Sequence, residues 1–144
     1  MRLSLVVGLL LLSMAPAGTV RGDEPRRAVD FNREIRPILS ESCYQCHGPD
    51  RNKRKSDLRL DLREGLFRTA DGTTVVVPGK PDESELLFRI TAEDDEIRMP
   101  PPQGGKRLTP GQVDRIKRWI EQGAVWKGHW AYLAPSRPAI RQAA

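Results

Sequence analysis

The chain has 144 residues, of which 38% are hydrophobic and 30% charged, and its formal net charge at pH 7 is +5. This length fits one domain and leaves little room for a second. A zinc site built from four protein ligands would need both cysteines and both histidines, and the second histidine, His129, is distant in sequence.

The first residues are typical of a secretory signal peptide. Arg2 precedes a short apolar run at residues 3–12, and Ala15-Pro16-Ala17 supplies the small residues of a cleavage site. A membrane anchor is the alternative, but the run is well short of the roughly 18 apolar residues that a span requires. We expect residues 1–17 to be removed, residues 18–28 to be a linker, and the mature protein to be periplasmic or extracellular, with no membrane span.

Residues 31–42, FNREIRPILSES, are predicted to form the first helix, with Asp30 as its N-cap. Its apolar side chains fall near one face at helical spacing: Phe31, Ile35, Ile38 and Leu39. Pro37 removes a backbone donor and disfavours helical geometry at the residue before it. The helix therefore either kinks at this proline or begins its regular part there, and it runs straight into Cys43.

The next five residues, Cys43-Tyr44-Gln45-Cys46-His47, contain both cysteines and one of the histidines. Cys-x-x-Cys-His is the attachment pattern for c-type haem, in which two thiols add across the porphyrin vinyl groups and the adjacent histidine binds iron. We predict one covalent haem c per chain, attached through Cys43 and Cys46, with His47 as the proximal iron ligand. Such attachment occurs outside the bacterial cytosol, in agreement with export.

Other interpretations of the cysteine pair have less support from the sequence. A thioredoxin-like motif is expected after a strand of a βαβ unit, whereas this pair follows a predicted helix. A Cys43–Cys46 disulfide suits an exported protein but leaves His47 without a role.

Basic residues are concentrated just after the motif: Arg51, Lys53, Arg54 and Lys55. Such a cluster is either a solvated loop, as its neighbours Pro49 and Asp50 favour, or a surface that attracts an acidic redox partner protein. Nucleic acid is a poor partner for an exported protein, so we expect no nucleic-acid binding.

The middle of the chain carries weaker signals. Residues 58–67 begin with alternate leucines, typical of a half-buried extended segment, and end in the pattern of one helical turn. Residues 75–77, three valines, are predicted to be extended and to end at a Pro-Gly pair. Residues 83–90 are predicted to form a helix, with Asp82 and Glu85 as a capping box.

Residues 91–107 are predicted to be a loop, acidic at first and then containing Met99 followed by three prolines. Met1 and Met14 leave with the signal peptide, so Met99 is the single methionine of the mature chain. A lone methionine usually fills a core, but a stiff, proline-locked segment suits a weak thioether ligand. We predict Met99 as the distal iron ligand, with His129 as the alternative.

Residues 108–124, LTPGQVDRIKRWIEQGA, contain the clearest helix. Thr109 is its N-cap, Pro110 takes the first helical position, and Gln112 is placed to complete a capping box. Gly123 supplies the stop. The apolar stripe is Val113, Ile116, Trp119 and Ile120.

Three helices and little strand predict a small, mainly α domain over residues 29–126, wrapped around the haem. Residues 127–144 would be a tail or the start of a linker. Because apolar residues are sparse for this length, we expect the haem to complete the core and the haem-free chain to be poorly packed. The side chains predicted to line the haem are Leu58, Leu60, Leu66, Val76, Leu86, Leu87 and Trp119.

These motifs resemble those of class I cytochromes c, and more closely the planctomycete-type cytochrome c domain, over residues 29–132. The resemblance is carried by residues 31–39, 43–47, 58–61, 77–81, 98–101 and 108–124. It implies that Cys43 and Cys46 attach haem and that His47 and Met99 are the iron ligands. In that family the domain usually stands at the amino terminus of a larger exported protein, which implies further domains.

The predicted function is one-electron transfer through a His/Met-ligated iron, without catalysis by the domain itself. One alternative is a haem-based peroxidase or a gas or redox sensor with a labile Met99, for which the acidic residues 93–96 would make the loop mobile. Another is a haem-free interaction domain closed by a disulfide.

Overall fold

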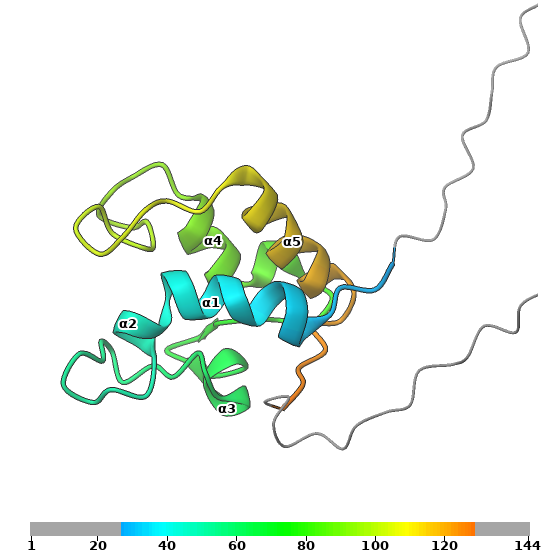
Figure 1. Ribbon diagram of the computed structural model, residues 1–144, viewed down its shortest axis with the longest axis horizontal. Coiled ribbons are helices and arrows are strands. Elements are labelled where there is room, and N and C mark those ends of the chain that lie inside the picture. Colours follow the sequence, from blue (N-terminus) through cyan, green and yellow to red (C-terminus); the bar gives the residue numbers. More distant parts are fainter. Residues whose placement is uncertain (1–26, 129–144) are drawn as a thin grey trace, which may run out of the picture.

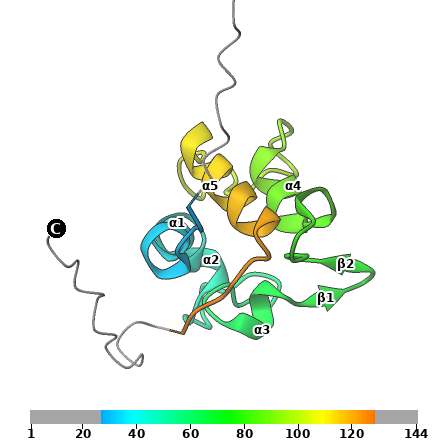
Figure 2. The same ribbon diagram turned by 90° about the vertical axis from the view of Figure 1, so that its right-hand side faces the viewer.

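The computed structural model describes residues 27–128. Its elements, in chain order, are η1 (Phe31–Ile35), α1 (Arg36–Ser42), α2 (Tyr44–His47), α3 (Arg63–Leu66), β1 (Thr69–Ala70), β2 (Thr73–Thr74), η2 (Pro81–Glu83), α4 (Glu85–Thr91) and α5 (Pro110–Glu121). α4 and α5 lie on one side of α1, and α3 lies on the other side (Figures 1 and 2). The prediction of a small, mainly α fold is confirmed.

The predicted signal peptide and the alternative ligand His129 lie outside the described residues. Between residues 27 and 128, no helix is both long enough and apolar enough to cross a membrane.

The first predicted helix is formed by η1 and α1 together. Asp30 caps it as predicted, because its Oδ1 accepts a hydrogen bond from the backbone N–H of Arg33 at 3.1 Å. One π-helical turn is followed by regular α-helix from Arg36, and Pro37 lies in the first turn of that α-helix. A missing backbone donor costs nothing in a first turn. Of the two predicted effects of Pro37, the structure therefore shows that the regular helix begins there.

α5 has the predicted capping box. The backbone N–H of Gln112 donates to Thr109 Oγ1 at 3.3 Å, and the backbone N–H of Thr109 donates to Gln112 Oε1 at 2.8 Å. The helix gives way to Gly123, whose φ of 94° suits glycine and ends the helical path. These local signals place both ends of α5 where the sequence predicts them.

The first and last helices pack together through aromatic side chains. The ring centroids of Phe31 and Trp119 are 5.5 Å apart, and Trp119 Nε1 donates a hydrogen bond to the carbonyl of Val125 at 3.1 Å. Around this contact lies one core, whose buried members include Ile35, Ile38, Leu39, Leu60, Leu66, Val76, Leu86, Leu87, Ile90, Leu108, Ile116 and Ile120.

This core is made by the protein's own side chains. That haem completes it stays a prediction. Four side chains predicted to line the haem lie in the core and not on the cavity described below: Leu66, Val76, Leu87 and Trp119. The other three, Leu58, Leu60 and Leu86, do line that cavity. The sequence shows that these positions are apolar, but it does not show which of them line the cavity and which lie only in the core.

The structure contains a short hairpin that the sequence analysis did not predict. Thr69–Ala70 pairs with Thr73–Thr74 in a two-residue hairpin, visible at the right of Figure 2, whereas residues 75–77 belong to no strand. Asp71 and Gly72, between the strands, have positive φ values of 51° and 76°. Asp-Gly is a strong signal for such a turn, so this hairpin was readable from the sequence.

The start of α4 also differs. The helix begins at Glu85, and the predicted capping box between Asp82 and Glu85 is not formed. The buried Ser84 hydroxyl instead donates to the carbonyl of Lys80 at 2.8 Å and accepts from the backbone N–H of Val77 at 2.9 Å. Glu85 is thereby left to pair along the helix with Arg89.

Candidate haem-attachment site

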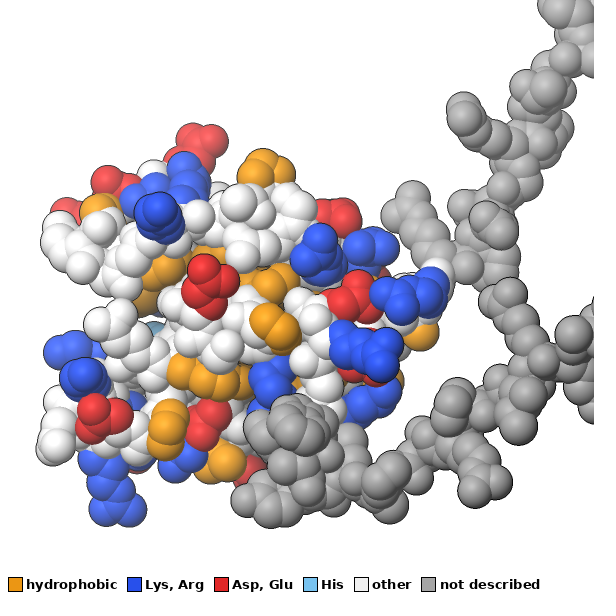
Figure 3. Space-filling model, viewed as in Figure 1, with side chains coloured by type: hydrophobic (Ala, Val, Ile, Leu, Met, Phe, Trp, Pro, Cys, Tyr) orange, Lys and Arg blue, Asp and Glu red, His pale blue; other side chains and the backbone are white. Residues whose placement is uncertain are grey.

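A cavity of about 350 Å³ lies between α2, α4 and the loop that joins α4 to α5. This volume is within the range typical of small-molecule and cofactor sites, roughly 300–1,000 Å³. It is lined by Ser42, Cys43, Cys46, His47, Ser56, Leu58, Leu60, Val75, Glu85, Leu86, Arg89, Ile90, Met99, Pro100, Pro101 and Gly104. In Figure 3 the surface is hollowed at the left, between the part formed by the α4–α5 loop and the part formed by the segment after α2.

All four predicted haem-binding residues line this one cavity. Cys43 ends α1, Cys46 and His47 belong to α2, and Met99 belongs to the α4–α5 loop. The fold therefore brings together residues that are far apart in sequence.

The Cys-x-x-Cys-His motif forms a single helical turn. The backbone N–H groups of Cys46 and His47 both donate to the carbonyl of Cys43, at 3.1 and 2.8 Å. Residues three and four apart share one face of a helix, so both cysteines and His47 are presented on the same side. Gly48 then allows a sharp exit, because a Cβ at this position would collide with the carbonyl oxygen of Tyr44.

The segment after the motif folds back against α2. The backbone N–H of Leu60 donates to the carbonyl of His47, and that of Lys55 donates to the carbonyl of Cys46, each at 2.8 Å. These bonds fix the far side of the motif and place Leu58 and Leu60 on the wall of the cavity.

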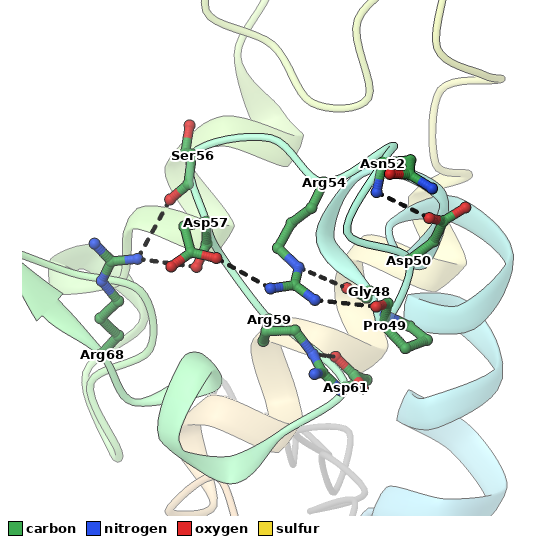
Figure 4. Close-up of polar contacts among 10 residues, drawn as sticks. All are labelled: Gly48, Pro49, Asp50, Asn52, Arg54, Ser56, Asp57, Arg59, Asp61 and Arg68. Atoms are coloured by element: carbon green, nitrogen blue, oxygen red, sulfur yellow. Dashed lines mark hydrogen bonds and ion pairs between the residues drawn. The ribbon is translucent and has the colours of Figure 1, made fainter.

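Arg54 holds this segment together. Its guanidinium donates to the carbonyls of Gly48 at 3.1 Å and Pro49 at 3.0 Å, and to the Asp57 carboxylate at 3.0 Å (Figure 4). The side chain of Arg54 is only 12% exposed. Arg51, Lys53 and Lys55 are exposed, which fits both a solvated loop and a partner surface, whereas Arg54 is mostly covered.

The thiols of Cys43 and Cys46 are free, with no disulfide between them. Burial raises the pKa of Cys43 to about 12, and the nearby Cys46 thiol acts in the same direction. A buried thiolate at this position would be costly, whereas a thioether carries no ionisable proton and is suited to an apolar environment. The environment of Cys43 therefore suits an uncharged sulfur, either a neutral thiol or a thioether.

The imidazole of His47 is about half-buried, and burial lowers its pKa below the usual value. A lowered pKa favours the neutral imidazole, which is the form that binds a metal ion. The Nδ1 atom of His47 is buried and has no hydrogen-bond partner among the described residues. His47 thus lines the cavity in surroundings that favour the uncharged imidazole.

The donor set and the walls fit a haem. Two free thiols and an imidazole come from α1 and α2, a thioether comes from the α4–α5 loop, and most of the remaining wall is apolar. Imidazole and thioether are ligands that haem iron takes in cytochromes c. Among residues 27–128, no group of three or more His, Cys, Asp or Glu side chains is placed to hold a metal ion.

A charged pair on the cavity wall was missed by the sequence analysis. Arg89 Nε donates to Glu85 Oε1 at 2.6 Å, and both residues line the cavity. Their spacing of four residues on one helix is a signal for such a pair, but it does not show that the pair faces a cavity.

Comparison with known proteins supports this assignment. The profile of the family described as Planctomycete cytochrome C matches residues 43–103, a segment that contains the Cys-x-x-Cys-His motif and Met99. No curated protein and no solved structure shows significant similarity to the chain. The matched segment starts at the end of α1 and stops before α5, so the flanking helices are assigned to the domain by their packing. Residues 43–103 therefore match the planctomycete cytochrome c family, in agreement with the resemblance of the motifs.

Proposed function

We propose that residues 29–126 are an exported electron-transfer domain with one covalently attached haem c. Cys43 and Cys46 would hold the porphyrin through thioether bonds, and His47 and Met99 would be the axial ligands of the iron. The observation that carries this proposal is that these four residues, from three parts of the fold, line one cavity. When bound, the haem iron supplies one-electron exchange between its ferric and ferrous states.

The protein's own residues have separate tasks in this proposal. The α2 turn presents the thiols and the imidazole on one face, and Arg54 keeps the following segment folded against that turn. Leu58, Leu60 and Leu86 provide an apolar wall that excludes water. A low-polarity surround and a thioether ligand both favour a higher reduction potential than bis-histidine ligation would give.

The partner we propose is a redox protein with an acidic surface. Arg51, Lys53 and Lys55 are exposed on the segment after α2, and Lys106 and Arg107 are exposed on the α4–α5 loop. Both segments contribute residues to the cavity wall. Positive charge on two sides of the opening would attract an acidic partner to the haem. The same proposal includes export through a signal peptide at residues 1–17, a tail after residue 126 and attachment to further domains.

The holoprotein, made by cells competent in cytochrome maturation, is expected to show a low-spin c-type spectrum with a near-infrared sulfur-to-iron band. Met99→Ala is expected to lose this band and to have a lower reduction potential, because the thioether ligand is removed. The measurements are visible and near-infrared spectroscopy with a redox titration.

Leu58→Ala is the matched control, since Leu58 lines the same cavity without offering a ligand. It should keep the band. A wild-type protein without the band, or a band that survives in Met99→Ala, would show that Met99 is not the distal ligand. Tight and rapid binding of carbon monoxide to the ferrous wild type would favour the peroxidase or sensor alternative.

A further inference from the structure

Met99 lies in a loop whose attachment near the methionine depends on Arg89 of α4. The backbone N–H of Met99 donates to the carbonyl of Arg89 at 3.0 Å, and Arg89 Nη1 donates to the carbonyl of Ile97 at 3.2 Å. Any residue at position 89 would supply the first bond, but only a long donor side chain supplies the second. Arg89 therefore holds the chain two residues before Met99 by an interaction specific to its side chain.

Glu85 fixes the guanidinium that makes this second bond. Arg89 Nε donates to Glu85 Oε1 at 2.6 Å, one helical turn earlier on α4. The guanidinium is planar and rigid, so orienting Nε toward Glu85 also orients Nη1 toward Ile97. Glu85, Arg89 and Met99 all line the cavity, which places this bridge beside the proposed distal ligand.

The rest of the loop offers less support. Its first residues, 93–96, are exposed, and the ion pair between Arg98 and Asp95, at 2.7 Å, is internal to the loop. Arg107 Nη2 binds the carbonyl of Ala92 at 2.8 Å, which joins the two ends of the loop without tying Met99 to the cavity. Apart from Pro100, which is buried beside Met99, the loop is therefore held to the rest of the domain by few polar contacts, and such a segment opens locally at low free-energy cost.

We propose that Arg89, oriented by Glu85, is a positioning residue for Met99: it holds the Ile97 carbonyl and so limits how often the distal position opens to an external ligand. This inference rests on the proposed function, because Met99 must be the distal ligand. The apparent affinity for an external ligand scales with the fraction of molecules in which the methionine has left the iron. Loss of a charge-assisted hydrogen bond, discounted for partial exposure, should raise that fraction by about tenfold.

The test is a titration of the ferric holoprotein with imidazole, followed by the loss of the sulfur-to-iron band. Arg89→Gln is expected to bind imidazole about tenfold more tightly than wild type. Arg89→Lys keeps the positive charge but cannot donate to Glu85 and Ile97 from two fixed positions. This variant is therefore also expected to bind imidazole more tightly than wild type. If Arg89→Lys behaves as wild type while Arg89→Gln does not, charge alone sets the affinity and the positioning role is wrong.

Arg118→Gln is the matched control. Arg118 pairs with Asp114 at 3.1 Å in the same four-residue spacing, on α5, and does not line the cavity. Its imidazole affinity should equal that of wild type, and urea unfolding of each variant separates a local effect from general destabilisation. If Arg89→Gln does not acquire haem, Glu85→Gln is the second variant, because it leaves Arg89 present but less well oriented. It is expected to bind imidazole two- to threefold more tightly than wild type.

The outcomes separate this inference from the proposed function. A wild-type protein with the band, together with unchanged imidazole affinity in Arg89→Gln or in Glu85→Gln, overturns the positioning role and leaves Met99 ligation in place. A wild-type protein without the band overturns Met99 ligation itself.

Discussion

Replacing Cys43 and Cys46 together by alanine is expected to abolish covalent haem attachment. Both thiols lie on one face of the α2 turn and line the same cavity, and neither is engaged in a disulfide. No other cysteine exists in the chain to replace them. Intact mass under denaturing conditions measures the result: the wild type should carry the mass of one haem, and the double variant should have the mass of the polypeptide alone.

Ser42→Ala is a suitable control, because Ser42 is adjacent to Cys43 and lines the cavity but cannot form a thioether. It should retain the full haem mass. A wild-type mass that is lower than the reduced polypeptide by two hydrogen atoms would instead show a Cys43–Cys46 disulfide. That result would favour the haem-free interaction domain.

Several signals that act within a few residues were read correctly from the sequence. The cap of α5 depends on Thr109 and Gln112, and the cap of η1 depends on Asp30, so each is decided by near neighbours. The Cys-x-x-Cys-His spacing likewise belongs to one helical turn. Met99 was predicted to lie beside this turn because its thioether can bind iron. No local pattern shows which distant residues meet in the fold.

Side chains whose partners lie outside the local sequence pattern were predicted wrongly. Ser84 binds the preceding segment at Lys80 and Val77, which displaced the expected capping box. The Arg54 guanidinium is bound by carbonyls that converge only after the chain has turned at Gly48. An arginine exposed to solvent and an arginine bound by backbone carbonyls have the same sequence pattern, so the sequence could not distinguish Arg54 from its exposed neighbours.

Core membership was ambiguous for a related reason. Leu60 and Trp119 were expected on one haem-facing surface, but only Leu60 lines the cavity, although both are buried. An apolar pattern shows that a position is buried and not which partner buries it. The domain therefore has an interior of its own beside the cavity, and its stability should depend strongly on that interior.

Trp119→Ala is expected to destabilise the domain by about 3–5 kcal/mol, the usual cost of removing a large buried aromatic side chain. Trp119 is 1% exposed and packs on Phe31 between the first and last helices. The substitution also leaves the carbonyl of Val125 without its indole donor. Since small domains are stable by only about 5–15 kcal/mol, the variant would retain little margin. Urea unfolding of the holoprotein, followed by far-ultraviolet circular dichroism, measures the change.

Trp119→Phe separates packing from hydrogen bonding at the same position. It keeps an aromatic ring against Phe31 but loses the bond to Val125, so the expected cost is smaller, about 1–2 kcal/mol. A loss below about 1 kcal/mol in Trp119→Ala would contradict the packing of α5 on the first helix. It would mean that attachment of the haem, and not the Phe31–Trp119 contact, provides most of the stability. The two variants therefore test whether the protein's own core or its cofactor holds the fold together.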